Sequence, residues 1–317
     1  ILDEAGDGSS PGEPQVNASN SRRARRARWA VLRPRNVSAM KALRRFGMLT
    51  TEQAARATGY KKSAICRALK ELADAGIASY GGFYARGDRE TLVVPTKASH
   101  VYTLTPAGRA RCITEGLADE SDLIYCREWK RRAIRDNHIY HHLAIVDCMI
   151  SCWWEFGALP GYQLTDMIPD FIKVHDGVSM RRVTTEVIGN AELPKSKQKR
   201  IEPDAIIKLT NRTTGKTGCF FIEVDRQTTS IQTVADKIRK YDEYLRWEKR
   251  RHNADLTLLI YAAMDERRID AILKDKHISW HELSKVQSQI RFGVLPKADE
   301  PFLQGQWRTK AGKHLPL

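Results

Sequence analysis

The sequence predicts a mixed α+β fold in two parts: short helices closed by a β-hairpin, then a part in which strands and helices alternate. Apolar residues recur at helical spacing up to about residue 76, and short apolar runs bounded by turn residues follow from about residue 200. At 317 residues the chain can form two domains, since a domain takes ~100 to 200 residues. With 42% hydrophobic and 29% charged residues, the composition excludes a collagen, a coiled coil and a disordered chain.

We predict five segments along the chain. They are a disordered basic arm (1–36), a first domain (37–118), a linker helix (119–132), a second domain (133–292) and an irregular tail (293–317). The tail is rich in proline and glycine, which disfavour regular elements.

Positive charge is concentrated near the N-terminus. The chain has 53 Lys and Arg against 38 Asp and Glu, a formal net charge of +15. Seven arginines and no acid lie between Arg22 and Arg35. Such a block repels itself and stays solvated, as is typical of arms that bind a polyanion; a simple solubility tail is the alternative. The arm residues that we expect to contact DNA are Arg22, Arg23, Arg25 and Arg26.

The sequence predicts a cytoplasmic protein without a membrane span. Its longest apolar run, Leu256 to Met264, falls well short of the roughly 20 residues that a span needs. Residues 1–20 are acidic and polar and lack the pattern of a secretory signal. The six cysteines form no CxxC pair, so neither a zinc ribbon nor a disulfide framework is indicated.

Three helices are predicted at the start of the first domain. The first runs from Ser38 to Arg45, and Thr50 and Gln53 form a capping box for the second, which ends at Gly59. The third runs from Ser63 to Ala75 and has an apolar face. Basic residues lie at its start and on its other faces: Lys61, Lys62, Arg67 and Lys70.

A β-hairpin is predicted next, with arms at Ile77 to Ala85 and His100 to Thr103 and a basic loop that contains Arg86. A basic helix followed by a hairpin is typical of winged helix-turn-helix domains, in which the helix fills the major groove of double-stranded DNA. The run Val101 to Gly108 resembles the end of the wing in such domains. We therefore expect the basic residues of the third helix, together with Arg86, to bind DNA. A winged helix that binds protein instead is the alternative.

The second domain contains an acidic hairpin. Apolar segments Ile201 to Leu209 and Gly218 to Asp225 flank a turn-forming stretch. A turn centred between Thr213 and Thr214 pairs residues whose numbers sum to 427, which places Asp204 opposite Glu223. Opposed residues on antiparallel strands share a face with Cβ atoms ~5 Å apart, and Asp225 lies on the same face.

Three carboxylates this close are unfavourable unless their pKa values rise or a cation lies between them. Mg²⁺, or Mn²⁺, fits because a hard divalent ion takes carboxylate oxygens and keeps several waters. We therefore predict Asp204, Glu223 and Asp225 as metal ligands. Alternatively, Asp204 is a turn-side cap and Asp225 begins the following helix.

Pro203-Asp204, followed after a hairpin by Phe221 to Asp225, resembles the PD-(D/E)xK nuclease superfamily. The wider pattern resembles the replication-relaxation family, which includes MobC-type plasmid relaxases. That family has a winged helix, a His-bearing helix, a PDA segment, an EVD segment, and a helix with Lys and Tyr. The matching residues, within roughly 37–265, are His141-His142-Leu143-Ala144, Pro203-Asp204-Ala205, Glu223-Val224-Asp225-Arg226, and Lys237 with Tyr241. The resemblance implies an N-terminal winged helix-turn-helix followed by an α/β restriction-endonuclease-like (PD-(D/E)xK) domain.

The chain departs from the nuclease pattern at one position. Two residues after Glu223, where that pattern has Lys, the chain has Asp225, and the replication-relaxation family shows an acid there too. Lys237 would supply a displaced positive charge; a solvated helix lysine is the alternative. Tyr241 lies at i+4 from Lys237 and so on the same helix face, where packing is a more common role than nucleophilic attack.

His138, His141 and His142 lie on the helix that begins the second domain. The resemblance implies that His141 or His142 lines the site, as general base or phosphate contact, because a histidine titrates near neutral pH. A core or capping role is the alternative. His138 and His142 have zinc-ligand spacing, but the chain lacks an accompanying HExxH glutamate or cysteine pair.

The resemblance implies a metal-dependent, site- and strand-specific DNA nickase that acts at a plasmid or mobile-element transfer or replication origin. Other mobilisation or coupling proteins would then be partners in conjugation. The alternative is a non-catalytic winged-helix replication or transcription regulator with a degenerate nuclease-like domain, which the missing lysine favours. A nonspecific defence or repair nuclease is a third hypothesis, and the winged helix argues against it.

Overall fold

The computed structural model describes residues 33–83, 99–117, 136–170, 173–175, 180–182, 184–189, 198–247, 254–263, 265–295, 307–311 and 314–315. Within these ranges the chain is a mixed α+β protein. The predicted arm contacts, Arg86 in the wing and the predicted linker helix lie outside the described residues.

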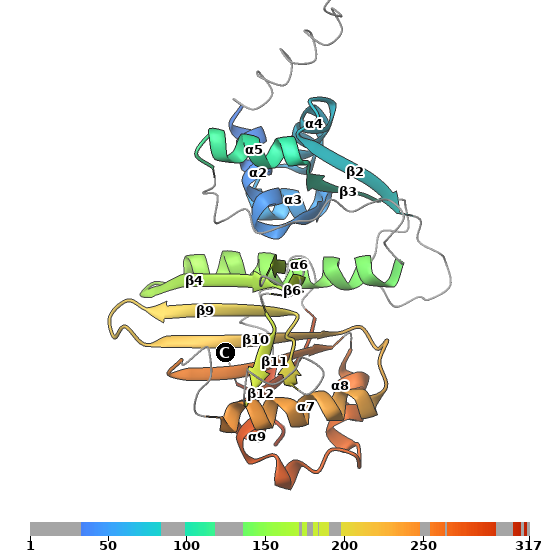
Figure 1. The fold of residues 1–317 in the computed structure, drawn as a ribbon, viewed down its shortest axis with the longest axis vertical. Coiled ribbons are helices and arrows are strands. Elements are labelled where there is room, and N and C mark those ends of the chain that lie inside the picture. Colours follow the sequence, from blue (N-terminus) through green and yellow to red (C-terminus); the bar gives the residue numbers. More distant parts are fainter. Residues whose placement is uncertain are drawn as a thin grey trace, which may run out of the picture.

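Figure 1 shows the architecture as layers. An N-terminal unit of helices and a small sheet lies on one side of the long helix α6 (Asp136–Ala158). On its other side α6 covers one face of a larger sheet. Helices α7 (Ile231–Arg246), α8 (Glu266–Lys274) and α9 (Ser284–Gln289) cover the opposite face. We call the part from α6 onward the sheet unit.

The N-terminal unit contains the predicted helices and hairpin. Its helices are α2 (Pro34–Phe46), α3 (Thr51–Thr58), α4 (Lys62–Asp74) and α5 (Pro106–Thr114). Its antiparallel sheet has the order β1 (Met48–Thr50), β3 (Ser99–Leu104), β2 (Ala78–Phe83). The predicted capping box of Thr50 and Gln53 is confirmed. Helix α2 begins earlier than predicted, because Pro34 has its backbone angle preset for the first helical position.

Helix α4 has the two predicted faces. Ile65, Leu69 and Leu72 are buried in the core of the N-terminal unit. The basic residues at its start and on its other faces are exposed: Lys61, Lys62, Arg67 and Lys70. The exposed face of α4 is therefore open to a ligand.

The sheet unit is built on a seven-stranded sheet. Its order is β14 (His314–Leu315), β13 (Trp307–Arg308), β12 (Ile290–Val294), β11 (Leu256–Ala263), β10 (Thr217–Asp225), β9 (Ala205–Asn211), β4 (Tyr162–Pro169). Strands β4, β9 and β10 are antiparallel, whereas β10, β11 and β12 are parallel. Parallel neighbours need a crossover, which α7 supplies between β10 and β11. Between β4 and β9 the chain forms two small hairpins, β5 (Lys173–His175) with β6 (Met180–Arg182) and β7 (Glu186–Ile188) with β8 (Lys199–Ile201). A short 3₁₀ helix, η3 (Trp280–Glu282), precedes α9.

The predicted register of the acidic hairpin is confirmed. Phe221 pairs with Ile206 and Ile222 with Ala205, and both pairs sum to 427. Because side chains alternate along a strand, Phe221 packs in the core beneath α7 and Ile222 in the core beneath α6. Odd-numbered residues of β10, Glu223 included, therefore lie on the α7 face.

The predicted irregular tail is wrong for residues 307–308 and 314–315, which extend the sheet as β13 and β14. Trp307 is only 1% exposed. It packs on Gly293 of β12, where a Cβ atom would lie 2.5 Å from the Trp307 ring. Because Trp307 is not part of a periodic pattern of apolar residues, the sequence does not predict that it is buried.

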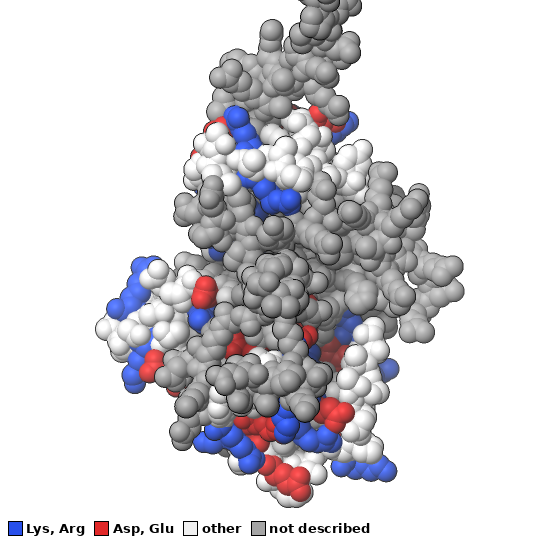
Figure 2. Space-filling model, viewed as in Figure 1, with Lys and Arg blue, Asp and Glu red and all other residues white. Residues whose placement is uncertain are grey.

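On the face drawn in Figure 2, Lys and Arg side chains of the sheet unit lie among Asp and Glu side chains. The arm, where we predicted the strongest positive charge, is outside the described residues. Among the described helices, none combines the length and the apolar character that crossing a membrane requires.

Candidate active site

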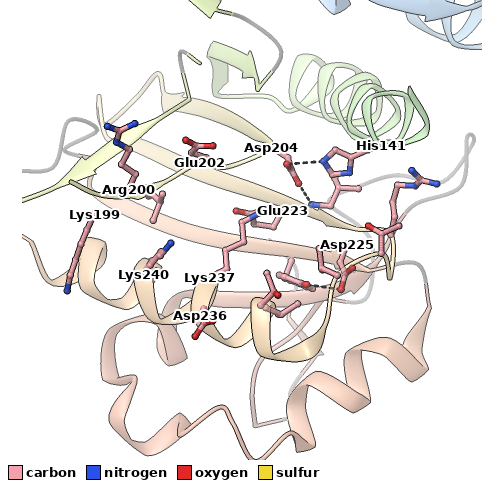
Figure 3. Close-up of a pocket in the computed structure, with 18 of the residues that line it drawn as sticks. His141, Lys199, Arg200, Glu202, Asp204, Glu223, Asp225, Asp236, Lys237 and Lys240 are labelled. Carbon is pink, nitrogen blue, oxygen red and sulfur yellow. Dashed lines mark hydrogen bonds and ion pairs between the residues drawn. The ribbon is translucent and has the colours of Figure 1, made fainter. Parts of the chain in front are cut away.

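A pocket of about 1020 Å³ lies where β10 ends, between the N-terminal part of α6 and helix α7. Five of the predicted site residues line it: His141, Asp204, Glu223, Asp225 and Lys237. Figure 3 shows Asp204 and Glu223 near one another, with His141 reaching from α6 and Lys237 from α7. Three further basic residues line the side away from His141: Lys199, Arg200 and Lys240.

Asp204 is held at the start of β9 by backbone and side-chain contacts. Its N–H donates to the Ile222 carbonyl at 2.9 Å, which continues the hairpin register. One carboxylate oxygen lies 3.0 Å from His141 Nε2, and the other accepts from the Val224 N–H at 2.8 Å. Burial alone would raise the pKa of Asp204, but the charge of Lys237 and the His141 hydrogen bond lower it to about 2. Asp204 is therefore an anion at neutral pH.

Glu223 lies opposite Asp204 and is only 2% exposed. It accepts hydrogen bonds from Lys237 Nζ and from the Tyr241 hydroxyl. Burial raises the pKa of Glu223 above its usual value and the charge of Asp204 adds to the rise, whereas the ion pair with Lys237 opposes it. A second cation beside Asp204 and Glu223 would stabilise their ionised forms, because both carboxylates depend on the charge of Lys237.

Lys237 lies on the inner face of α7, between the buried residues Val234 and Tyr241. Burial would lower the pKa of Lys237, but the charges of Glu223 and Asp204 raise it above its usual value. Lys237 therefore stays protonated and forms an ion pair with Glu223. The displaced positive charge expected from the sequence is present beside the carboxylates.

The two candidate histidines have different partners. Burial would lower the pKa of His141, but the hydrogen bond and the charge of Asp204 raise it. His142 lies 4.0 Å from Asp170, and it is absent from the pocket lining. Of the two, only His141 contacts the carboxylate pair in the described structure.

Asp225 does not join the pair, although it is buried and lines the pocket. Its carboxylate accepts from the Arg268 Nε at 2.7 Å, the Tyr261 hydroxyl at 2.8 Å and the Gln227 N–H at 2.7 Å. Gln227 has a positive φ of 59°, so the loop after β10 turns sharply here. The prediction of three converging carboxylates is therefore wrong in one member, because donors from β11, α8 and this loop hold Asp225.

Within the described ranges, no group of three or more His, Cys, Asp or Glu side chains is arranged to hold a metal ion. The pair of Asp204 and Glu223 still fits a hard divalent ion, because Mg²⁺ is usually bound by one or two carboxylates and completes its shell with waters and phosphates. A metal there would share both carboxylates with Lys237.

Sequence reasoning missed Asp170, which follows β4 and is 4% exposed. Its N–H donates to the Asp204 carbonyl at 2.8 Å, and the register that pairs Pro169 with Ala205 places it opposite Asp204. The available signal was a second Pro-Asp dipeptide, Pro169-Asp170, which repeats Pro203-Asp204. Arg268 was also missed, because nothing in its local sequence indicates that it reaches Asp225.

A family model with the description "Replication-relaxation" matches residues 40–258, more than two thirds of the chain. The matched range includes α3, α4, α6 and the site residues His141, Asp204, Glu223 and Lys237. The chain has no significant match among curated proteins or among solved structures.

Proposed function

Because this chain belongs to the replication-relaxation family, which indicates a role in plasmid replication or relaxation, we propose that it is a metal-dependent DNA nickase. It would cut one strand at the transfer or replication origin of a plasmid or mobile element. The observation that carries the proposal is the meeting of Asp204, Glu223, Lys237 and His141 at one pocket.

The fold supports two domains with these roles. The order of helices and strands in the N-terminal unit supports the winged helix-turn-helix domain that we propose, in which the exposed basic face of α4 would bind duplex DNA. In the sheet unit the order α6, β4, β9, β10, α7, β11, with the small strands β5 to β8 inserted between β4 and β9, supports the PD-(D/E)xK domain that we propose. We propose two domains near residues 37–118 and 133–292, with the first extended to Pro34 by α2 and the second extended to residue 315 by β13 and β14.

Strand cleavage requires positive charge on the developing phosphate oxygens and a place for the transferred proton. Held by Asp204 and Glu223, Mg²⁺ or Mn²⁺ would supply a bound water of lowered pKa and polarise the phosphate. The Lys237 ammonium lies beside Glu223 and would neutralise a phosphate oxygen. Asp204 orients the His141 ring through Nε2, which leaves Nδ1 to exchange a proton.

The test is nicking of a supercoiled plasmid that carries the element's origin, in Mg²⁺, Mn²⁺ or EDTA. Asp204→Asn and Glu223→Gln should each lower the rate by ~10²-fold or more and leave binding to origin DNA unchanged. Asp236→Asn is the matched control, because Asp236 lines the same pocket but pairs with Arg239. Equal nicking by wild type and Asp204→Asn would refute the proposal.

A non-catalytic replication or transcription regulator is the second candidate. The pairing of Asp225 with Arg268 favours it, because the strand position of the usual nuclease lysine is occupied by an acid with a structural partner. A regulator would bind origin DNA equally well in EDTA and in Mg²⁺ and would leave the plasmid uncut in both.

A further inference from the structure

Helix α3 of the N-terminal unit is joined to α6 by four hydrogen bonds. Arg56 donates to Asp147 Oδ1 at 2.7 Å and to Ser151 Oγ at 3.2 Å. The Gln53 side chain donates to the Leu143 carbonyl at 2.9 Å, and Trp154 Nε1 donates back to the Arg56 carbonyl at 2.7 Å. The bonds span three turns of α6, so they restrain rotation as well as separation of the two helices.

Apolar packing joins the same two units. Leu43 and Phe46 of α2, Met149 of α6 and Ile222 of β10 belong to one continuous hydrophobic cluster. The Arg45 guanidinium also lies over the ring of Trp153, 3.8 Å from its centroid. Domains that move independently usually meet through smaller and more polar contacts. A shared core therefore indicates that the N-terminal unit and the sheet unit have one fixed arrangement.

The same helix also reaches the candidate active site. His141 of α6 contacts Asp204, while Leu143 and Asp147 on α6 contact α3. At 1.5 Å per helical residue, these two contacts lie only ~3 Å and ~9 Å along the axis from His141. One helix thus contacts both the proposed DNA-binding unit and Asp204 of the candidate active site.

We infer that α6 fixes the number of nucleotides between the DNA segment held by the N-terminal unit and the phosphodiester that reaches Asp204 and Glu223. The inference rests on the proposed function for the existence of a cut, and it names Arg56 as a positioning residue. Successive phosphates of one strand lie ~3.4 Å apart along the duplex axis. A shift by one nucleotide would therefore break hydrogen bonds of 2.7 to 3.2 Å between α3 and α6.

The first test measures the arrangement without DNA or cleavage. Spin labels at Asp74→Cys on α4 and Lys274→Cys on α8, with the native Cys66 and Cys126 replaced by Ser, report the distance between units by double electron–electron resonance. We expect one narrow distance distribution that broadens in Arg56→Ala and narrows again in the charge exchange Arg56→Asp with Asp147→Arg. A broad distribution in the chain with the native interface would overturn the inference.

The second test measures spacing on DNA and does not require the protein's own cleavage. An iron chelate coupled to Lys240→Cys, in the same Ser background, cuts bound origin DNA near the pocket by hydroxyl radicals. Two base pairs are then inserted between the bound segment and the sequence that the radicals cut in the unaltered origin DNA. The radical cuts should keep their distance from the bound segment, and cuts that stay with the originally cut sequence would contradict a fixed spacing.

The matched control in both tests is Glu52→Gln, which breaks the ion pair with Lys62 inside the N-terminal unit and leaves α6 untouched. It should keep the narrow distance distribution and the spacing of the cuts. Arg56→Ala should spread the cuts over neighbouring phosphodiesters while DNA affinity stays unchanged. If the protein binds DNA with fixed spacing but never nicks it, the proposed function fails and the inference about spacing stands.

Discussion

Replacing Tyr241 by Phe tests whether this tyrosine attacks DNA or supports Glu223. Tyr241 is 1% exposed, and its hydroxyl donates to Glu223. Burial and the charge of Glu223 raise the pKa of Tyr241 well above its usual value, so the phenol stays protonated and is a poor nucleophile. A hydrogen bond to a charged group contributes ~1.5–3 kcal/mol. Because Lys237 still pairs with Glu223 in the variant, we expect the lower end, a loss of ~1.5 kcal/mol in unfolding free energy.

Urea unfolding and plasmid nicking measure the two consequences of this change. If the whole loss acts on the placement of Glu223, nicking slows by ~10-fold but continues, since ~1.4 kcal/mol corresponds to a factor of ten. Tyr244→Phe is the matched control, because its ring packs on the same Phe221 as the ring of Tyr241. A different result would show that Tyr241 is a covalent nucleophile. In that case Tyr241→Phe would abolish nicking at unchanged stability, and the wild-type protein would form an adduct with DNA that survives detergent.

Three further predictions concern stability. Arg268→Met should lower the unfolding free energy by ~3–5 kcal/mol, because it leaves the buried Asp225 carboxylate without its cation; adding Asp225→Asn should recover part of the loss in urea unfolding. Trp307→Ala should cost ~3–5 kcal/mol in the same assay, and a cost below ~1 kcal/mol would show that the tail does not belong to the sheet. Burial raises the pKa of Glu71, but the Asn36 hydrogen bond and two arginines of the N-terminal unit outweigh burial and hold it below about 4.5. The ionised Glu71 carboxylate therefore stabilises the fold above about pH 4.5, and this stabilisation is lost as the pH falls through the folded-state pKa. The melting temperatures of wild type and Glu71→Gln should differ at pH 7 and converge in acid. A difference that does not change with pH would contradict the assignment.

The parts of the fold that the sequence predicted correctly are those that local rules determine. The capping box at Thr50, the apolar face of α4 and the hairpin turn each depend on residues a few positions apart. Once the turn is centred, the register follows for the whole hairpin, and Asp204 falls opposite Glu223 without any knowledge of the rest of the chain.

The parts that could not be predicted depend on partners far away in sequence. Asp225 shares a strand face with Glu223, as expected, but its carboxylate is held by Arg268, which lies 43 residues further along the chain. His141 and His142 are neighbours, and only the orientation of α6 on the sheet decides that His141 meets Asp204. Asp170 is a neighbour of Asp204 because β4 pairs with β9, and the sequence alone does not indicate that pairing.

The missing strand lysine has a structural explanation that bears on activity. A lysine two residues after Glu223 would lie on the α7 face of β10, because alternate strand residues share a face. Helix α7 covers that face, so a lysine on its inner side can reach the same carboxylate, and Lys237 does so. Because Lys237 supplies the positive charge, residue 225 need not be a lysine. Asp225 instead accepts hydrogen bonds from Arg268 and from the loop after β10. The site therefore has both carboxylates and a lysine although residue 225 is an acid. The identity of residue 225 alone does not indicate an inactive site.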